Sequence, residues 1–358
     1  MNDKFFFVNH FDFYYWFNII NLCLGVNKFM SYTNTTHIRK ELTKSNMFKN
    51  YKNLKPMPKL KIRCGLKGGL PFENLITDCC SGCLELNNVC YGNCTAAIFW
   101  YNKGYNFGKR QINIFDETLF LSDLTKISKN QKWFRLGWVS DCSFSHESWK
   151  IASHISELLN KRKLHLLIIT KIHTIPSDDV LFQLAKNNTE IRVSLSALDT
   201  IDEIEKRLNF LLKYKTLGGI SIPYLMSCKY KNQALDKNQQ YIIDFIEKNN
   251  FLAGEHPLRV EHTNILRKEL CDNGFSHPKY PHQYWFGRIL HNHKNFILPP
   301  PTHLAPCYSL KYKSLTELKN IKYIRGARKN LPTYEDLKNN KIKNLKELNK
   351  HAAYSIQK

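Results

Sequence analysis

The sequence has little arginine for a chain of its charge. Of its 53 basic residues 41 are lysine and 12 are arginine, and 30 acidic residues leave a formal net charge of +23. A field of this strength attracts polyanions in general. Arginine, however, is the residue that holds phosphates and base edges with a rigid fork of donors. We therefore expect a basic surface, while the scarcity of arginine lowers the expectation that nucleic-acid recognition is the main function.

Two common signatures of function are also missing. No G-x-G-x-x-G or G-x-x-x-x-G-K-[ST] motif follows any expected strand, which argues against the usual phosphate-binding loops of open α/β sheets. The 11 cysteines are odd in number and, apart from one dense group, are scattered singly. This distribution does not fit a disulfide framework, and a chain of 358 residues needs none to fold. We expect a reducing, cytoplasmic environment.

The amino-terminal stretch from Phe5 to Val26 is aromatic and aliphatic but is not a continuous apolar run. It contains Asn9, His10 and Asp12 among other polar residues, whereas a membrane span needs about 20 predominantly apolar residues. No small-residue cleavage site follows it. We predict no membrane span and assign residues 1–56 to a poorly structured N-terminal extension, with an interfacial helix as the alternative.

Successive strand–helix units occupy the central part of the chain. Apolar runs predict strands at residues 135–141, 165–171, 191–196 and 220–226 and a further strand in 251–260, and helical spacing of apolar residues predicts helices at 147–159, 177–185, 199–214 and 239–248. Strands joined through helices are parallel, and their apolar character indicates that both faces of the sheet are covered.

These units predict an α/β fold with a full or partial (β/α) TIM-type barrel at residues 57–310. A doubly wound open sheet is the alternative, and the absence of a glycine-rich loop favours the barrel. Residues 311–358 form a basic helical tail in this scheme, rich in lysine.

Polar residues stand at the carboxyl ends of the expected strands, where ligands bind in barrels and in open sheets alike. They are Ser140, Asp141 and Cys142 after the first strand, Thr170 and Lys171 after the second, Ser194 and Ser196 in the third, and Ser227 and Cys228 after the fourth. Such residues also cap the helices that follow, so each has a structural alternative. Polar residues at consecutive strand ends favour a binding site.

Five cysteines stand within sixteen residues just before the strand–helix series. They are Cys79, Cys80, Cys83, Cys90 and Cys94, and from Cys80 onward their spacing is C-x2-C-x6-C-x3-C. Thiolates are soft ligands that bind iron–sulfur clusters and zinc. Gly82 and Gly92 allow so short a segment to bend. We infer that the segment 79–94 binds a metal.

A cysteine-rich loop with an aromatic residue beside a cysteine, Cys90-Tyr91, ahead of a run of βα units resembles the radical S-adenosylmethionine superfamily. In that superfamily three cysteines hold a [4Fe–4S] cluster at the mouth of a partial barrel. Residues 135–141, 166–171 and 193–198 resemble successive barrel strands of such enzymes, and the likeness covers about residues 60–260.

The resemblance implies an iron–sulfur enzyme that reductively cleaves S-adenosylmethionine and abstracts hydrogen from an unknown substrate, with an electron donor as a partner. It assigns the cluster to Cys83, Cys90 and Cys94, with Cys80 as a further candidate ligand. It also places Asp141, Lys171, Ser194 and Ser196 in the pocket for the cosubstrate or the substrate.

The loop differs from the C-x3-C-x2-C spacing usual in that superfamily, and two alternatives stay open. Zinc held by the same cysteines would stabilise a nucleic-acid-binding protein, with the basic tail at Lys319 to Lys350 as a contact to nucleic acid. In the other alternative, a barrel enzyme carries purely structural cysteines. Metal content distinguishes the three.

Overall fold

A computed structural model describes residues 52–67, 74–83, 95–127, 133–137, 139–261, 274–276, 283–290, 292–297, Glu335 and Lys338. All of them belong to the compact unit Asn34–Lys358. The predicted extension (1–56) lies outside the described residues except for 52–56, and the predicted tail (311–358) except for Glu335 and Lys338.

The main element is an eight-stranded sheet with the order β15-β11-β10-β9-β8-β7-β3-β2. Its strands are β2 (Cys64–Lys67), β3 (Asn74–Ile76), β7 (Trp133–Leu136), β8 (His165–Thr170), β9 (Glu190–Ser196), β10 (Ile220–Ser227), β11 (Ala253–Pro257) and β15 (Phe296–Ile297). Neighbouring strands are parallel from β3 to β15, and β2 pairs antiparallel with β3 at the edge. The predicted α/β class with a mostly parallel sheet is confirmed.

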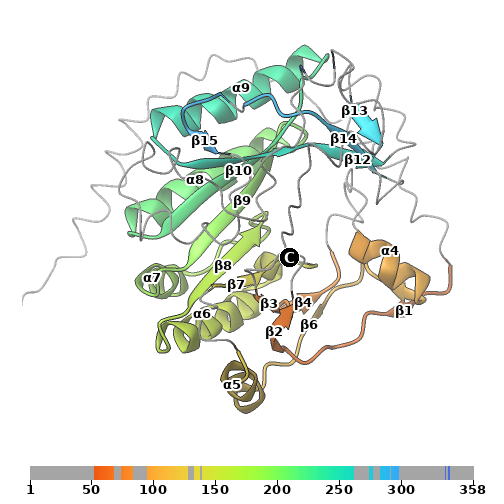
Figure 1. Ribbon diagram of the computed structural model, residues 1–358, viewed down its shortest axis with the longest axis vertical. Helices are drawn as coiled ribbons and strands as arrows, with labels where there is room; N and C mark the ends of the chain where they lie inside the picture. Colours follow the sequence, from red (N-terminus) through yellow and green to blue (C-terminus); the bar gives the residue numbers. More distant parts are fainter. Residues whose placement is uncertain are drawn as a thin grey trace, which may run out of the picture. The chain divides into compact units, whose positions relative to one another are not determined.

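Helices connect the parallel strands and cover the sheet. They are α5 (Glu117–Thr125), α6 (His146–Asn160), α7 (Asp178–Lys186), α8 (Ile201–Thr216) and α9 (Gln233–Lys248), with a short 3-10 turn, η2 (Cys142–Phe144), ahead of α6. Figure 1 shows α6, α7 and α8 together on one side of the sheet, as right-handed connections between strands in chain order require.

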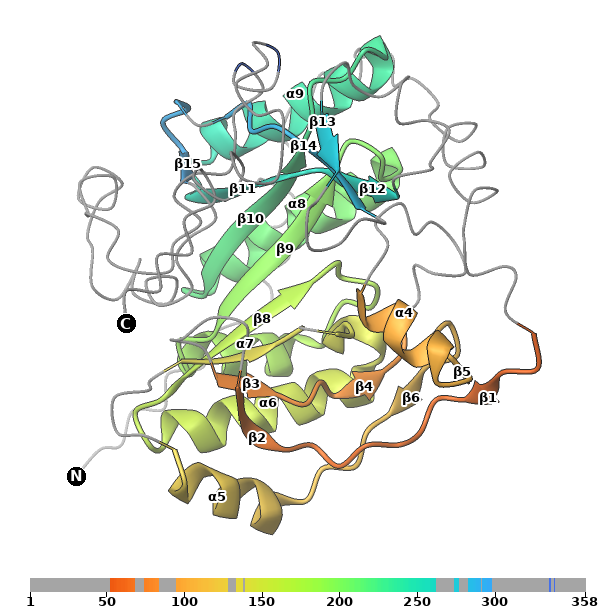
Figure 2. The same ribbon diagram turned by 45° about the vertical axis from the view of Figure 1, so that its right-hand side comes forward.

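A smaller group of elements lies beside β2 and β3. It comprises β1 (Lys55–Pro56), β4 (Cys80–Ser81), α4 (Thr95–Asn102), β5 (Tyr105–Asn106) and β6 (Gln111–Ile112). β1 pairs with β5, and β4 pairs with β6. Figure 2 shows this group together at the lower right. A separate three-stranded sheet contains β12 (Arg259–Glu261), β13 (Gly274–Ser276) and β14 (Gln283–Phe286).

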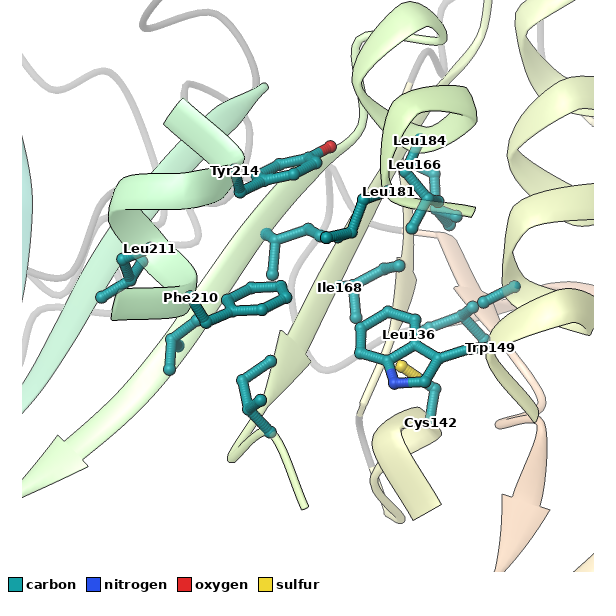
Figure 3. Close-up of a cluster of buried hydrophobic side chains, with 14 of the residues drawn as sticks. Leu136, Cys142, Trp149, Leu166, Ile168, Leu181, Leu184, Phe210, Leu211 and Tyr214 are labelled. Atoms are coloured by element: carbon teal, nitrogen blue, oxygen red, sulfur yellow. The ribbon is translucent and has the colours of Figure 1, made fainter. Parts of the chain in front are cut away.

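The hydrophobic core lies between the sheet and α6, α7 and α8. Figure 3 shows Leu136 and Ile168 from the strands close to Trp149 of α6, all of them buried. Leu181 and Leu211 extend the same cluster along α7 and α8. Because burial of one large apolar side chain stabilises a fold by about 1.5–3 kcal/mol, this cluster holds the strands that carry the polar ends described below.

The predicted boundaries were wrong in three places. The strand expected at 135–141 ends at Leu136, because Gly137 takes a positive φ of 84°. The helix expected from residue 199 begins at Ile201, because Thr200 and Glu203 form a capping box. The helix expected from residue 239 begins at Gln233, because the Asn232 side chain accepts hydrogen bonds from two backbone N–H groups of its first turn.

In the described part of the chain, no helix is both long and apolar enough to cross a membrane.

Glu190, at the amino-terminal end of β9, gives the fold a pH dependence. It is fully buried, and its Oε1 lies 2.6 Å from Nε of Arg192. Burial raises the pKa of Glu190 from 4.5 to about 7, although Arg192 opposes the shift. Between these pH values the folded chain holds a proton that the unfolded chain releases, so the free energy of unfolding falls as the pH rises through this window.

We expect Glu190→Gln to remove that fall, measured as the free energy of unfolding in urea at several pH values from about 4.5 to 7. Glu147→Gln, at an exposed position of α6, is the matched control and should keep the wild-type slope. Equal slopes in wild type and Glu190→Gln would contradict the assignment.

Candidate functional site

The cysteine segment begins at the carboxyl end of β3. β3 ends at Ile76, and Cys79 follows three residues later. The backbone N–H of Asn113 donates to the Cys79 carbonyl at 2.9 Å, and Cys80 then pairs with Ile112 of β6. The start of the segment is therefore held as a strand along β6.

A tight turn follows at Gly82. Its φ is +94°, and a Cβ at this position would lie 2.8 Å from the carbonyl oxygen of Phe107 and 3.0 Å from Cα of Arg110. Only glycine fits such a turn without a shift of the backbone. The N–H of Cys83 donates to the same Phe107 carbonyl at 2.7 Å, so the turn carries Cys83 next to the segment that contains Arg110.

The cysteines around this turn differ in burial. Cys79 is fully buried in the hydrophobic core together with Cys142. Cys80 is also buried, and its Sγ donates to the carbonyl oxygen of Asp141 at 3.2 Å. Cys83 is half-buried. Of these cysteines, Cys83 is the one that a ligand from outside the core can reach most readily.

The electrostatic surroundings of these thiols are mixed. Burial raises the pKa of the Cys80 thiol, and the nearby carboxylate of Asp78 raises it further. Arg110 is a positive charge that interacts with Cys80 and Cys83. Burial lowers the pKa of its guanidinium, and the interaction with Cys80 and Cys83 opposes that shift. The guanidinium also lies 4.1 Å from the ring centroid of Phe144, which holds it beside the cysteine turn.

A buried carboxylate ties the segment to the next strand. Asp78 accepts hydrogen bonds from the backbone N–H groups of Gly137 at 2.7 Å, Val139 at 2.8 Å and Ser140 at 2.7 Å. Hydrogen bonds to a charged acceptor are stronger than neutral ones. The loop after β7 therefore wraps around the side chain that immediately precedes Cys79.

Asp141 connects that loop to the end of β8. Its carboxylate accepts hydrogen bonds from Oγ1 of Thr170 at 2.7 Å and from the N–H of Lys171 at 2.6 Å. The N–H of Ser143 donates to it at 2.8 Å, and Nε2 of His173 lies 3.7 Å away. Asp141 thus links the loop after β7, in which it lies, to the end of β8.

Asp199 and Arg207 continue the network to β9. Arg207 of α8 is buried, and its Nη1 lies 2.5 Å from Oδ2 of Asp199. Nε of Arg207 donates to the Lys171 carbonyl at 2.6 Å, and Nη1 to the Ser194 carbonyl at 3.5 Å. The ammonium group of Lys171 lies 3.6 Å from Oδ1 of Asp199. The hydroxyl of the fully buried Ser196 accepts the N–H of Leu198 at 3.2 Å.

The four predicted pocket residues, Asp141, Lys171, Ser194 and Ser196, are therefore brought into one network. The N–H of Ser196 enters it by donating to Asp199 at 2.9 Å. Ser227, at the end of β10, lies apart from these contacts: its hydroxyl donates to Glu255 at 2.7 Å, and Glu255 also accepts the N–H groups of Ile289 and Leu290.

Two of the four predicted metal ligands, Cys90 and Cys94, lie outside the described residues. Among the residues that are described, no three His, Cys, Asp or Glu side chains are grouped to hold a metal ion. The donor chemistry of Cys80 and Cys83 nevertheless fits a soft metal centre. A buried thiol whose pKa is raised loses its proton when a metal binds, because the charge of the metal stabilises the thiolate.

No family model matches this chain, and no solved structure matches it. The chain is 24% identical over 151 residues to nucleolar transcription factor 1 of Homo sapiens and of Rattus norvegicus, which covers 41% of this chain and 19% of those proteins. The corresponding match to nucleolar transcription factor 1-B of Xenopus laevis is 23% identical and covers 21% of that protein. The chain spans about a fifth of the length of the curated relatives it matches, and at this identity the match does not establish a family.

Sequence reasoning missed four residues of the site: Asp78, Arg110, Asp199 and Arg207. Asp78 stands directly before the cysteine group, and Asp199 stands three residues after the end of β9, so the positions of both residues in the sequence pointed to the site. Arg110 lies far from Cys80 and Cys83 in the sequence, and Arg207 contacts Lys171 36 residues away as well as the nearer Asp199; no local pattern marks either arginine.

We expect Asp78→Asn to lower the free energy of unfolding by about 2–3 kcal/mol, because the charged acceptor of three backbone hydrogen bonds is lost. Chemical denaturation at neutral pH measures the change. Asp244→Asn at an exposed position of α9 is the control and should stay within about 0.5 kcal/mol of wild type. A similarly small change in both variants would show that the hydrogen bonds from residues 137–140 to Asp78 do not stabilise the fold.

Proposed function

We propose that this protein is an iron–sulfur enzyme that resembles the radical S-adenosylmethionine superfamily. The observation that carries the proposal is the place of the cysteine segment. It starts at the carboxyl end of β3, beside the strand ends that carry Asp141, Lys171 and Ser194. A metal held by this segment would face the edge of the sheet at which α/β enzymes bind their ligands.

The strand order supports a partial (β/α) barrel. From β3 to β15 the strands lie in chain order, whereas a doubly wound sheet reverses its order at a switch point. Sequential parallel strands with the helices on one side form the wall of a barrel. In a partial barrel the carboxyl ends of these strands surround one pocket.

The chain's own residues have distinct tasks in this proposal. Cys83, Cys90 and Cys94 would hold a [4Fe–4S] cluster, with Cys80 as the further candidate. When bound, the cluster supplies the electron, received from an external donor, that cleaves the sulfonium of S-adenosylmethionine and starts hydrogen abstraction from the substrate. Asp141 and Lys171 position the bound molecules at the strand ends, and the protein keeps water from the reacting atoms. A reducing cytoplasm, as expected from the cysteines, suits such a centre.

A second candidate function is a zinc-stabilised nucleic-acid-binding protein. The net charge of +23 favours it, as does the partial match to proteins named nucleolar transcription factors. Structural cysteines in a barrel enzyme are the third candidate, and the full burial of Cys79 and Cys142 favours this role for those two residues.

Anaerobic reconstitution with iron and sulfide tests the proposal. We expect the wild-type chain to gain visible absorption and, with a chemical reductant, to release 5′-deoxyadenosine from S-adenosylmethionine. Cys90→Ala should lose most of both signals because one thiolate ligand is gone.

Cys228→Ala is the matched control. Cys228 is buried at the end of β10, and its backbone hydrogen bonds to Gln239 survive the substitution. It should reconstitute like the wild type. Unchanged absorption in Cys90→Ala would count decisively against the ligand assignment, and bound zinc in the purified chain would favour the second candidate.

A further inference from the structure

Two stretches of chain beside the cysteine turn contain no acidic residue. Residues 52–67 and 95–115, which form β1, β2, α4, β5 and β6, have nine lysine and arginine residues and no aspartate or glutamate. Six of the lysines are exposed: Lys52, Lys55, Lys59, Lys61, Lys103 and Lys109. We call these six residues the basic face.

The basic face is continuous with the cysteine turn through backbone pairing. Lys55 pairs with Tyr105, and Lys61 forms a bridge with Ile114. The strand that ends near Ile114 is β6, whose partner is β4 with Cys80. Figure 2 shows β1, β5, β6 and β4 near one another. Neighbouring strands therefore connect Lys61 to the strand that carries Cys80.

An exposed aromatic ring accompanies these charges. Phe99 of α4 is 49% exposed, although phenylalanine is usually buried. Nζ of Lys103 lies 4.2 Å from the centre of its ring. An exposed ring beside a lysine is the arrangement on which the bases of single-stranded nucleic acids stack while a phosphate meets the cation.

We propose that the basic face binds the phosphate backbone of a single-stranded nucleic acid and presents one of its nucleotides to the cysteine turn. The substrate of the enzyme would then be a nucleotide within a polymer, an assignment that rests on the function proposed above; the binding surface does not rest on it. Lysine suits this task, because it meets phosphates as a point charge and needs no particular base sequence. We favour nucleic acid over an acidic protein because the exposed Phe99 ring beside Lys103 offers a base a surface on which to stack.

Binding is measured by fluorescence anisotropy with the full chain, without reconstitution, and a labelled single-stranded RNA or DNA oligonucleotide at several salt concentrations. The variant Lys55→Gln/Lys59→Gln/Lys61→Gln should bind about tenfold more weakly at low salt, and the slope of log affinity against log salt should fall by about 2. Phe99→Ala should weaken binding severalfold with an unchanged slope.

The control variant Lys186→Gln/Lys237→Gln/Lys248→Gln removes the same charge from exposed positions of α7 and α9. It should bind like the wild type, and thermal unfolding should be alike in the two triple variants. If oligonucleotide binding were weakened equally in the two triple variants, the basic face would be overturned as the binding surface, because net charge alone would then govern binding. Displacement of the oligonucleotide by poly-glutamate at equal charge concentration would overturn nucleic acid as the partner.

The substrate assignment has its own readout. After reconstitution, the oligonucleotide should increase the release of 5′-deoxyadenosine by the wild type and not by the basic-face triple variant. A wild-type chain that releases 5′-deoxyadenosine and binds the oligonucleotide without such an increase would overturn the assignment. Absence of 5′-deoxyadenosine under all conditions would instead be a failure of the proposed function, and the anisotropy measurement would still decide on the surface.

Discussion

The carboxylate of Asp78 accepts three backbone N–H groups from residues 137–140, and the position of the cysteine segment depends on this interaction. Asp78 immediately precedes Cys79, so the loop after β7 and the start of the cysteine segment cannot move independently. The same loop continues into Asp141, whose carbonyl oxygen accepts a hydrogen bond from the thiol of Cys80. The cysteine turn is thereby held against the edge of the parallel sheet from two directions.

The same arrangement recurs along the sheet. Asp141 binds the loop after β8, Asp199 binds the end of β9 and Lys171, and Glu255 joins β10 to residues 289–290. At each of these strand ends a carboxylate accepts hydrogen bonds from a strand, a helix or a loop beside it. Polar groups buried in this way rigidify a site when they are fully satisfied. A rigid edge is what an enzyme needs to orient reactants without paying their ordering cost during the reaction.

The sequence predicted the repeating strand–helix units because apolar runs and helical spacing are local signals. The ends of the elements were harder to predict. The early end of β7 depends on Gly137 and on a carboxylate 59 residues away in the chain, and no local pattern reveals such a partner. The start of α9 depends on a single capping residue, Asn232.

The residues of the site were predictable only where a local pattern in the sequence marks them. Asp141 and Lys171 stand at strand ends, where a single sequence already marks them. Arg110 reaches the cysteine turn through the pairing of β4 with β6, two strands of two residues each, which are too short to leave a periodic pattern. The basic face emerges only when residues 52–67 and 95–115 are seen to pair, because each stretch by itself reads as an ordinary charged loop.

The content of iron and acid-labile sulfide in the anaerobically reconstituted full-length chain tests the central claim most directly. If the cysteines between positions 79 and 94 hold one [4Fe–4S] centre, the chain should contain about four iron atoms and about four sulfide ions. A folded chain that takes up neither, or that is isolated with about one zinc ion, would contradict the account.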